Sequence, residues 1–215
     1  MSDIYVFDAY GTLFDVHSAV AALRDDIGPQ ADRLSELWRS KQLEYTWVRT
    51  LVGRYQPFDA LTRQSLDVAA ARCGGLSDSL KLRLLNAYQT LTAYEDVMPA
   101  LRRLRARGAK TAIFSNGTRP QLDIAVGAAG LDGLFDAIIS VDDIGIYKTD
   151  PRAYALVTQH FACSPQEITF QSSNRWDIAG GQAFGFACNW INRSGQPDEY
   201  ADLPPQHIYS DLNGL

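Results

Sequence analysis

The first fifteen residues constrain the fold of this chain more than any other stretch. An apolar run, residues 4–7, leads directly into Asp8, and Gly11 and Thr12 follow within four residues. Such a run is typical of a short buried strand that ends in a turn. In an open parallel sheet, ligands bind beyond the carboxyl ends of the strands. Asp8 is therefore a candidate nucleophile or metal ligand, although an aspartate considered alone is also compatible with a cap of a helix or turn.

Beyond this strand, the second half of the chain alternates short apolar runs with helical patterns. Apolar runs predict four further strands, at about residues 111–114, 137–140, 168–170 and 187–191. Helical segments separate them, and Pro151 suits the first position of one of these helices. Strands that alternate with helices predict an α/β fold with a doubly wound parallel sheet and right-handed crossovers.

Between the first strand and the others lies a long stretch with helical texture and no convincing strand. Its longest predicted helix carries a second apolar stripe of Leu43, Trp47 and Leu51. This stripe predicts that the helix is packed against other protein surfaces on more than one side. Phe58 is expected in the loop that follows this helix. We therefore expect a helical cap subdomain of residues 16–90, inserted into an α/β core domain of residues 1–15 and 91–215.

Composition excludes several classes of protein. A hydrophobic share of 46% with 21% charged residues is ordinary for a globular chain. The net charge of −5 provides no basic surface for nucleic acid, so an anionic substrate would need a local cationic pocket. Cys73, Cys163 and Cys188 show no CxxC pairing, which favours free thiols in a reducing compartment. Because the sequence shows neither a signal-peptide pattern nor a run long enough to cross a membrane, we expect a cytoplasmic protein without a membrane partner.

Polar residues follow each of the predicted strands that should end at one edge of the sheet. They are Asp8, Tyr10 and Thr12 after the first strand, Ser115 and Asn116 after the second, Lys148 after the third, and Ser172, Asn174 and Asp177 after the fourth. Each one singly is better explained as a cap or turn residue, and Lys148 as a solvated surface lysine. Their convergence at four strand ends is what predicts a site.

The order of these motifs resembles the haloacid dehalogenase superfamily, whose α/β core is Rossmann-like. Finer details are similar to the L-2-haloacid dehalogenases within that superfamily. Tyr10 stands two residues after the candidate nucleophile, residues 37–47 resemble the cap helix of that group, and residues 172–177 resemble its fourth motif. Matches of this length are more specific than a lone short motif. Arg175 departs from the small residue expected there, and would either point outward or add charge near the pocket.

The residue type at position 10 favours the same subdivision on chemical grounds. A phosphatase of this superfamily needs a second aspartate two residues after the nucleophile, because a departing alkoxide must be protonated. Halide is a weak base that leaves without a proton, and it needs hydrogen-bond donors and positive charge around it. Tyr10 in place of the acid therefore suits carbon–halogen cleavage, and Lys148 can neutralise a substrate carboxylate without a metal.

The resemblance implies hydrolytic dehalogenation of small (S)-2-haloalkanoic acids to (R)-2-hydroxy acids, through an ester on Asp8 and with release of halide; fluorinated acids and haloacetates are possible further substrates. The catalytic residues that it implies are Asp8, Thr12, Arg39, Lys148, Tyr154, Ser172, Asn174 and Asp177. The substrate-binding residues that it implies are Ala9, Tyr10, Arg39, Leu43, Phe58, Ser115, Asn116 and Trp176. No metal ion and no cofactor are expected. The resemblance and the second apolar stripe also predict a homodimer.

Two other functions stay open at this stage. A phosphatase of the same superfamily would require an acid at the position of Tyr10. A non-catalytic member that only binds a small anion would be expected to lack the nucleophile or the lysine, and both Asp8 and Lys148 are present. The expected ligands are a small anionic 2-haloacid and halide.

Overall fold

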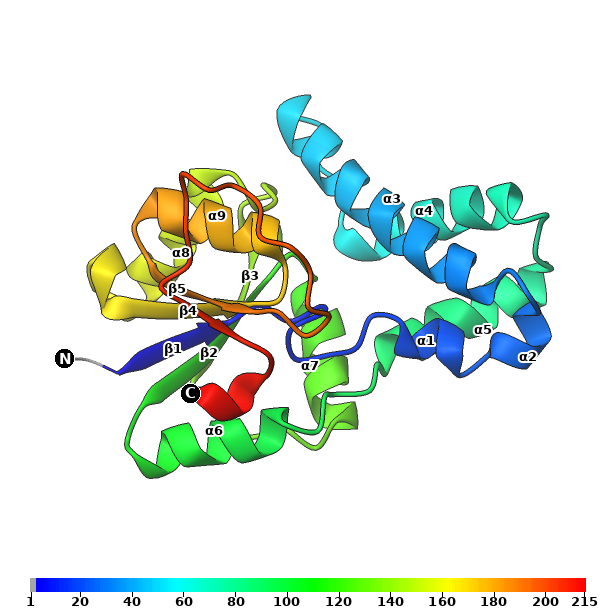
Figure 1. Ribbon diagram of the computed structural model, residues 1–215. Helices are drawn as coiled ribbons and strands as arrows, with labels where there is room; N and C mark the ends of the chain where they lie inside the picture. Colours follow the sequence, from blue (N-terminus) through cyan, green and yellow to red (C-terminus); the bar gives the residue numbers. More distant parts are fainter. Residues whose placement is uncertain (1–2) are drawn as a thin grey trace.

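The computed structural model describes residues 3–215 and contains one six-stranded parallel sheet, in the order β3-β2-β1-β4-β5-β6 (Figure 1). The strands are β1 (Ile4–Phe7), β2 (Lys110–Ser115), β3 (Ala137–Ser140), β4 (Ile168–Ser172), β5 (Ala187–Ile191) and β6 (His207–Tyr209). All neighbouring strands are parallel, and helices α6 (Val97–Ala106) and α9 (Arg175–Phe184) lie on opposite faces of the sheet. The predicted doubly wound α/β fold is confirmed. The sixth strand was not predicted, because β6 has only three residues and its side chains are largely exposed.

The first strand lies in the middle of this sheet, between β2 and β4. Its residues Ile4, Val6 and Phe7 are almost fully buried, as expected for a strand covered on both faces. Beyond the strand, the Asp8 N–H still donates to the Gln171 carbonyl at 2.9 Å. The chain then turns tightly, with Gly11 at a φ of +91°, a conformation that side-chain-bearing residues rarely adopt. The central position of the strand and this turn fix the place of Asp8 at the carboxyl edge.

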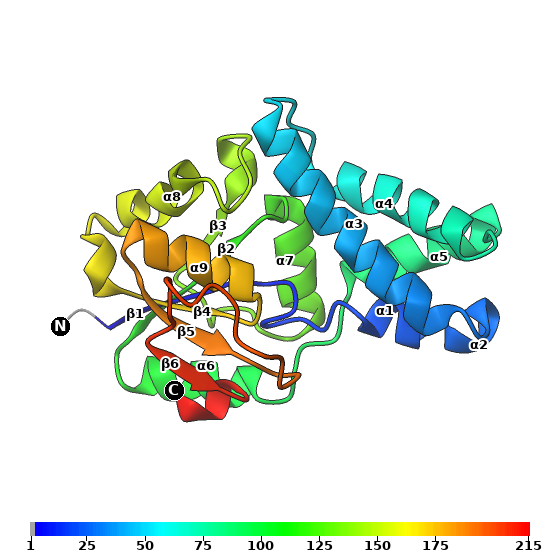
Figure 2. The ribbon, with the colours of Figure 1, turned by 45° about the horizontal axis from the view of Figure 1, so that its top comes forward.

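Five helices lie between β1 and α6 in the chain, and they gather to one side of the sheet (Figures 1 and 2). They are α1 (Ser18–Ala21), α2 (Arg24–Ile27), α3 (Ala31–Leu51), α4 (Phe58–Arg72) and α5 (Asp78–Gln89). The long helix α3 packs along α4, and it buries Leu34, Trp38 and Gln42, which recur at a four-residue spacing on one face. Helices α7 (Arg119–Ala128) and α8 (Pro151–Phe161) complete the crossovers of the sheet.

The helical stretch differs from the sequence expectation at the start of α4 and along the second apolar stripe of α3. Phe58 does not lie in a loop: it is the first residue of α4, directly after Pro57, and is 1% exposed. Proline there has no N–H, so it ends the preceding loop without losing a helical hydrogen bond. The second stripe of α3 is uncovered within one chain, since Leu51 is 85% exposed and Trp47 36% exposed. No helix among residues 3–215 is both long enough and apolar enough to cross a membrane.

Candidate active site

Asp8 is a buried carboxylate with a full set of hydrogen-bond donors around one of its oxygens. Its Oδ2 accepts from Asn174 Nδ2 at 2.8 Å, Thr12 Oγ1 at 3.1 Å and Ser172 Oγ at 3.5 Å. Its Oδ1 accepts from Lys148 Nζ at 3.1 Å. Three donors on Oδ2 fix the plane of the carboxylate, whereas Oδ1 keeps a lone pair for a further partner.

Lys148 is fully buried and is satisfied by three acceptors. Besides Asp8, its ammonium donates to Asp177 Oδ2 at 2.8 Å and to the carbonyl of Phe114 at 2.8 Å. The same nitrogen lies 4.2 Å from the centroid of the Phe114 ring, which adds a favourable cation–π contact. Three donors on three acceptors are what an ammonium group needs when it is removed from water. The lysine thereby joins two carboxylates in one buried ion-pair network.

Asp177 is the second carboxylate of the network, and it is also fully buried. Burial raises the pKa of Asp177 to about 6, the charge of Asp8 adds to this rise, and the neighbouring Lys148 ammonium opposes it. The Tyr154 hydroxyl donates to Asp177 Oδ1 at 2.8 Å. Tyr154 thus lies behind Asp177, and its hydroxyl donates to Asp177 rather than to Asp8. A carboxylate with a pKa near neutrality is suited to exchange protons with water.

The backbone after Asp8 presents free donors toward the same edge of the sheet. Within residues 3–215, the N–H groups of Ala9 and Tyr10 have no backbone partner, whereas those of Gly11 and Thr12 do. Ser115 and Asn116 lie at the end of β2, as predicted. Their acceptor atoms are already used: Ser115 Oγ accepts from Gly117 N at 3.1 Å, and Asn116 Oδ1 accepts from Lys148 N at 3.0 Å. These contacts leave the hydroxyl proton and the amide NH₂ as the donors available to a bound anion.

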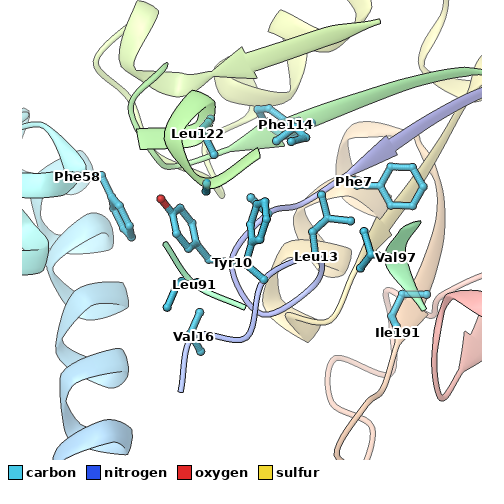
Figure 3. Close-up of a cluster of buried hydrophobic side chains, with 14 of the residues drawn as sticks. Phe7, Tyr10, Leu13, Val16, Phe58, Leu91, Val97, Phe114, Leu122 and Ile191 are labelled. Carbon is cyan, nitrogen blue, oxygen red and sulfur yellow. The ribbon is translucent and has the colours of Figure 1, made fainter. Parts of the chain in front are cut away.

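Helices α3 and α4 contribute the other wall of the site. Arg39 on α3 is half-buried, and its Nη2 lies 3.3 Å from both the Tyr10 carbonyl and Asn174 Oδ1. The Tyr10 ring packs against Phe58 with centroids 5.3 Å apart, and Figure 3 shows it reaching toward Phe58 beside Leu122. Leu43 is four residues after Arg39, on the same face of α3. Trp176 faces α3 from α9, where its ring contacts Trp47 edge-on at 5.6 Å.

The structure therefore brings the predicted site residues together from separate stretches of the chain. Arg175 points away from Asp8: its guanidinium binds Asp198 at 2.5 Å and the carbonyls of Tyr200 and Leu203. Two residues next to the site were not predicted from the sequence. They are Gln42, buried beside Arg39, and Tyr88, buried beside Tyr10. The sequence feature that could have indicated Gln42 is its position three residues after Arg39, on the same face of the same helix.

No group of three or more His, Cys, Asp or Glu side chains able to hold a metal ion occurs in residues 3–215.

Comparison with known proteins identifies the family to which these features belong. The model of the haloacid dehalogenase-like hydrolases matches residues 3–185, which is most of the chain. The chain belongs to the haloacid dehalogenase-like hydrolase family. This hydrolase is 49% identical over 211 residues to (S)-2-haloacid dehalogenase 1 of Pseudomonas sp. (strain CBS-3), a match that covers 98% of this chain and 93% of that protein.

Solved structures agree with this family assignment. The hydrolase matches a crystal structure described as a dehalogenase with a TM-score of 0.97 and 44% identity, over 99% of this chain and 95% of the other. It also matches the L-2-haloacid dehalogenase from Xanthobacter autotrophicus with chloropropionic acid covalently bound, with a TM-score of 0.91 and 34% identity. That match covers 99% of this chain and 96% of the other.

Proposed function

We propose that this hydrolase converts small (S)-2-haloalkanoic acids to (R)-2-hydroxy acids and halide through an ester on Asp8. The observation that carries the proposal is the buried Asp8–Lys148–Asp177 network beside Tyr10, a neutral residue at the position where a phosphatase needs its acid. Burial raises the pKa of the Tyr10 phenol, so this side chain is a poor proton donor. The similarity to (S)-2-haloacid dehalogenase 1 and to the Xanthobacter enzyme with chloropropionic acid covalently bound supports the same reaction.

In the first step, Asp8 Oδ1 attacks carbon 2 of the substrate from the side opposite the halogen. A carbon–oxygen bond forms, and the carbon–halogen bond breaks with its electron pair leaving on the halide. Thr12, Ser172 and Asn174 hold Oδ2 through their hydrogen bonds, which keeps Oδ1 aimed outward. Inversion at carbon 2 converts the (S) acid into the (R) ester.

The second step hydrolyses the ester and restores Asp8. Asp177 takes a proton from water, which attacks the carbonyl carbon of the ester. The bond between this carbon and the oxygen attached to carbon 2 then breaks, and the hydroxy acid leaves with the oxygen that came from Asp8 and takes up the second proton of the water. The new carboxylate keeps the oxygen of the water. Lys148 and Tyr154 hold Asp177 in place for this step through their hydrogen bonds at 2.8 Å. Because Asp177 titrates near neutrality, it can accept the proton and return it to solvent.

The remaining predicted residues divide between the two ends of the substrate. The backbone N–H groups of Ala9 and Tyr10, with Ser115 and Asn116, would bind the carboxylate of the substrate. Arg39 supplies positive charge to the departing halide, and the Asn116 amide is a further donor. Tyr10, Leu43, Phe58 and Trp176 would enclose the alkyl part in an apolar pocket, where ionic interactions are stronger than in water.

The arrangement of domains, the oligomeric state and the location belong to the same proposal. We assign residues 16–90 to a cap subdomain and residues 1–15 and 91–215 to the core. A homodimer would cover the exposed Val48, Leu51 and Val52 at the end of α3, since contiguous exposed apolar residues favour association. Leu51→Asp should therefore shift the protein toward monomer in sedimentation velocity, and an unchanged sedimentation coefficient would contradict this interface. Three free cysteines favour a reducing compartment such as the cytoplasm.

The decisive experiment combines halide release with an isotope label. The protein is expected to release chloride from (S)-2-chloropropanoate and not from the (R) enantiomer, with and without a chelator. In a single turnover in heavy-oxygen water, the first hydroxy acid should carry unlabelled oxygen, because that oxygen comes from Asp8. Label in the first product would show direct attack by water on carbon 2. Hydrolysis of a phosphate ester that a chelator abolishes, without any halide release, would replace the proposal by a phosphatase.

A further inference from the structure

Gln42 is an almost completely buried polar side chain on α3, and every polar atom of its amide has a partner. It is 1% exposed. Its Nε2 donates to Thr62 Oγ1 on α4 at 2.7 Å, and its Oε1 accepts from the Tyr88 hydroxyl on α5 at 3.1 Å. The same Oε1 lies 3.4 Å from Arg39 Nη1. One amide thus connects three helices with the arginine that faces the site.

These contacts make Gln42 the fixed point against which Arg39 is held. The other two hydrogen bonds of Arg39, to the Tyr10 carbonyl and Asn174 Oδ1, are both 3.3 Å long and come from a single nitrogen, Nη2. A long, half-buried arginine has many rotamers and needs a second anchor to keep one of them. Gln42 provides that anchor on Nη1, and it cannot itself rotate while Thr62 and Tyr88 hold both ends of its amide.

The chemical type of this residue matters as much as its position. A glutamine oxygen accepts a hydrogen bond from the guanidinium without neutralising its charge. A carboxylate at the same place would form a charge-assisted, bidentate pair with Arg39 and would compete with any anion that Arg39 should bind. The hydroxyl of Tyr88 donates to Gln42, and the ring of Tyr88 stacks on Tyr10 with centroids 5.7 Å apart. The network therefore runs along the wall of the site from Arg39 to Tyr10.

We propose that Gln42 is a positioning residue for leaving-group departure: it aims the Arg39 guanidinium at the halide and leaves its positive charge available. This inference rests on the proposed function, in which Arg39 stabilises the departing halide. Chloride is a poorer leaving group than bromide and needs more of this stabilisation. Loss of positioning should therefore slow the release of chloride more than the release of bromide.

The test measures kcat/KM for (S)-2-chloropropanoate and (S)-2-bromopropanoate, because this parameter reports the steps up to the first irreversible one, halide release. Gln42→Glu should lower kcat/KM for the chloro acid by about tenfold or more, the order expected when one stabilising donor is misdirected. The bromo-to-chloro ratio should rise severalfold at the same time. Tyr88→Phe removes one of the two hydrogen-bond partners that lock Gln42, so it should raise the ratio as well, but by less.

Thr46→Val is the matched control, because Thr46 is buried on the same helix one turn later and bonds only to the Leu43 carbonyl within residues 3–215. It should leave the bromo-to-chloro ratio unchanged. An equal loss for both acids in Gln42→Glu and Tyr88→Phe would overturn the inference, since a purely structural role affects both substrates alike. Tyr88→Phe keeps the test valid if a buried carboxylate prevents Gln42→Glu from folding. If the wild type is active and both variants keep its bromo-to-chloro ratio, only this inference is refuted. A wild type that releases no halide would refute the proposed function.

Discussion

Acidification should stop the second half of the proposed reaction while the first half continues. Burial raises the pKa of Asp177 to about 6, and this residue must be ionised to take a proton from water. A group with that pKa is ionised in only about one molecule in ten at a pH near 5, by the ordinary titration relation. Hydrolysis of the ester should therefore be slower at about pH 5 than on the plateau near pH 8, by at most about tenfold, because esterification removes the Asp8 charge that adds to the rise in the pKa of Asp177.

The same group should change stability with the opposite sign. The carboxyl of Asp177 has its ordinary, lower pKa in the unfolded chain, so the folded protein binds more protons between that value and about 6. Its contribution to the free energy of unfolding is fully present below the unfolded pKa and is lost as the pH rises through about 6. Over this window activity should rise with pH while the contribution of Asp177 to stability falls. Asp177→Asn removes the titrating group and should remove both trends.

Rapid-quench measurements with enzyme in stoichiometric amount separate the two halves. Near pH 5, halide should appear in a burst of one equivalent, and the hydroxy acid should follow slowly from accumulated ester on Asp8. Mass spectrometry of the quenched protein should show the adduct. Halide and hydroxy acid appearing together at this pH would refute the assignment of Asp177, as would steady turnover by Asp177→Asn.

Three further changes test particular contacts. In Gly180→Ala, the new Cβ would lie 2.2 Å from Tyr154 Oη, so Tyr154 should lose its bond to Asp177, and steady-state turnover should fall about tenfold or more; full activity would contradict the role of Tyr154. In Arg175→Ala, the C-terminal segment loses its bonds to the guanidinium, and the free energy of unfolding in urea should fall by about 1–3 kcal/mol, whereas Arg105→Ala on the surface should change it by less than about 1 kcal/mol. In Gly117→Ala, the Cβ would lie 2.8 Å from the Tyr10 ring, so KM for the haloacid should rise several-fold as that wall shifts; a wild-type KM would show that the ring moves freely.

The fold was predictable because its strongest signals are local. The apolar runs of β1, β2, β4 and β5 are short, buried and bounded by turn residues, so each one marks a strand without knowledge of its partners. β6 offers no such signal, since it is exposed and acquires its strand geometry from pairing with β5. The start of α4 at Phe58 was missed because an aromatic residue after proline also fits a loop.

The site was predictable where residues follow strand ends, and less so where they come from helices. Asp8, Lys148 and Asp177 meet because parallel strands end at one edge, which sequence order alone indicates. Arg39 could be placed there only by family resemblance, since nothing local distinguishes it from a surface arginine. Gln42 and Arg175 depend on which neighbours their helix faces meet, and that information is in the tertiary structure alone.

The placement of β1 at the centre of the sheet has an effect on how the chain folds in the cell. Ile4 is synthesised before its partners Lys110 and Ile168, which are far downstream, beyond helices α1 to α6. At roughly 5–20 residues per second, the first partner strand follows no sooner than about five seconds later. During that delay an apolar strand with two unpaired edges is free to bind chaperones or a second nascent chain. A circular permutant that begins in the exposed loop before α4 would synthesise β1 close behind β4, β5 and β6, and should give a higher soluble yield at high expression rates.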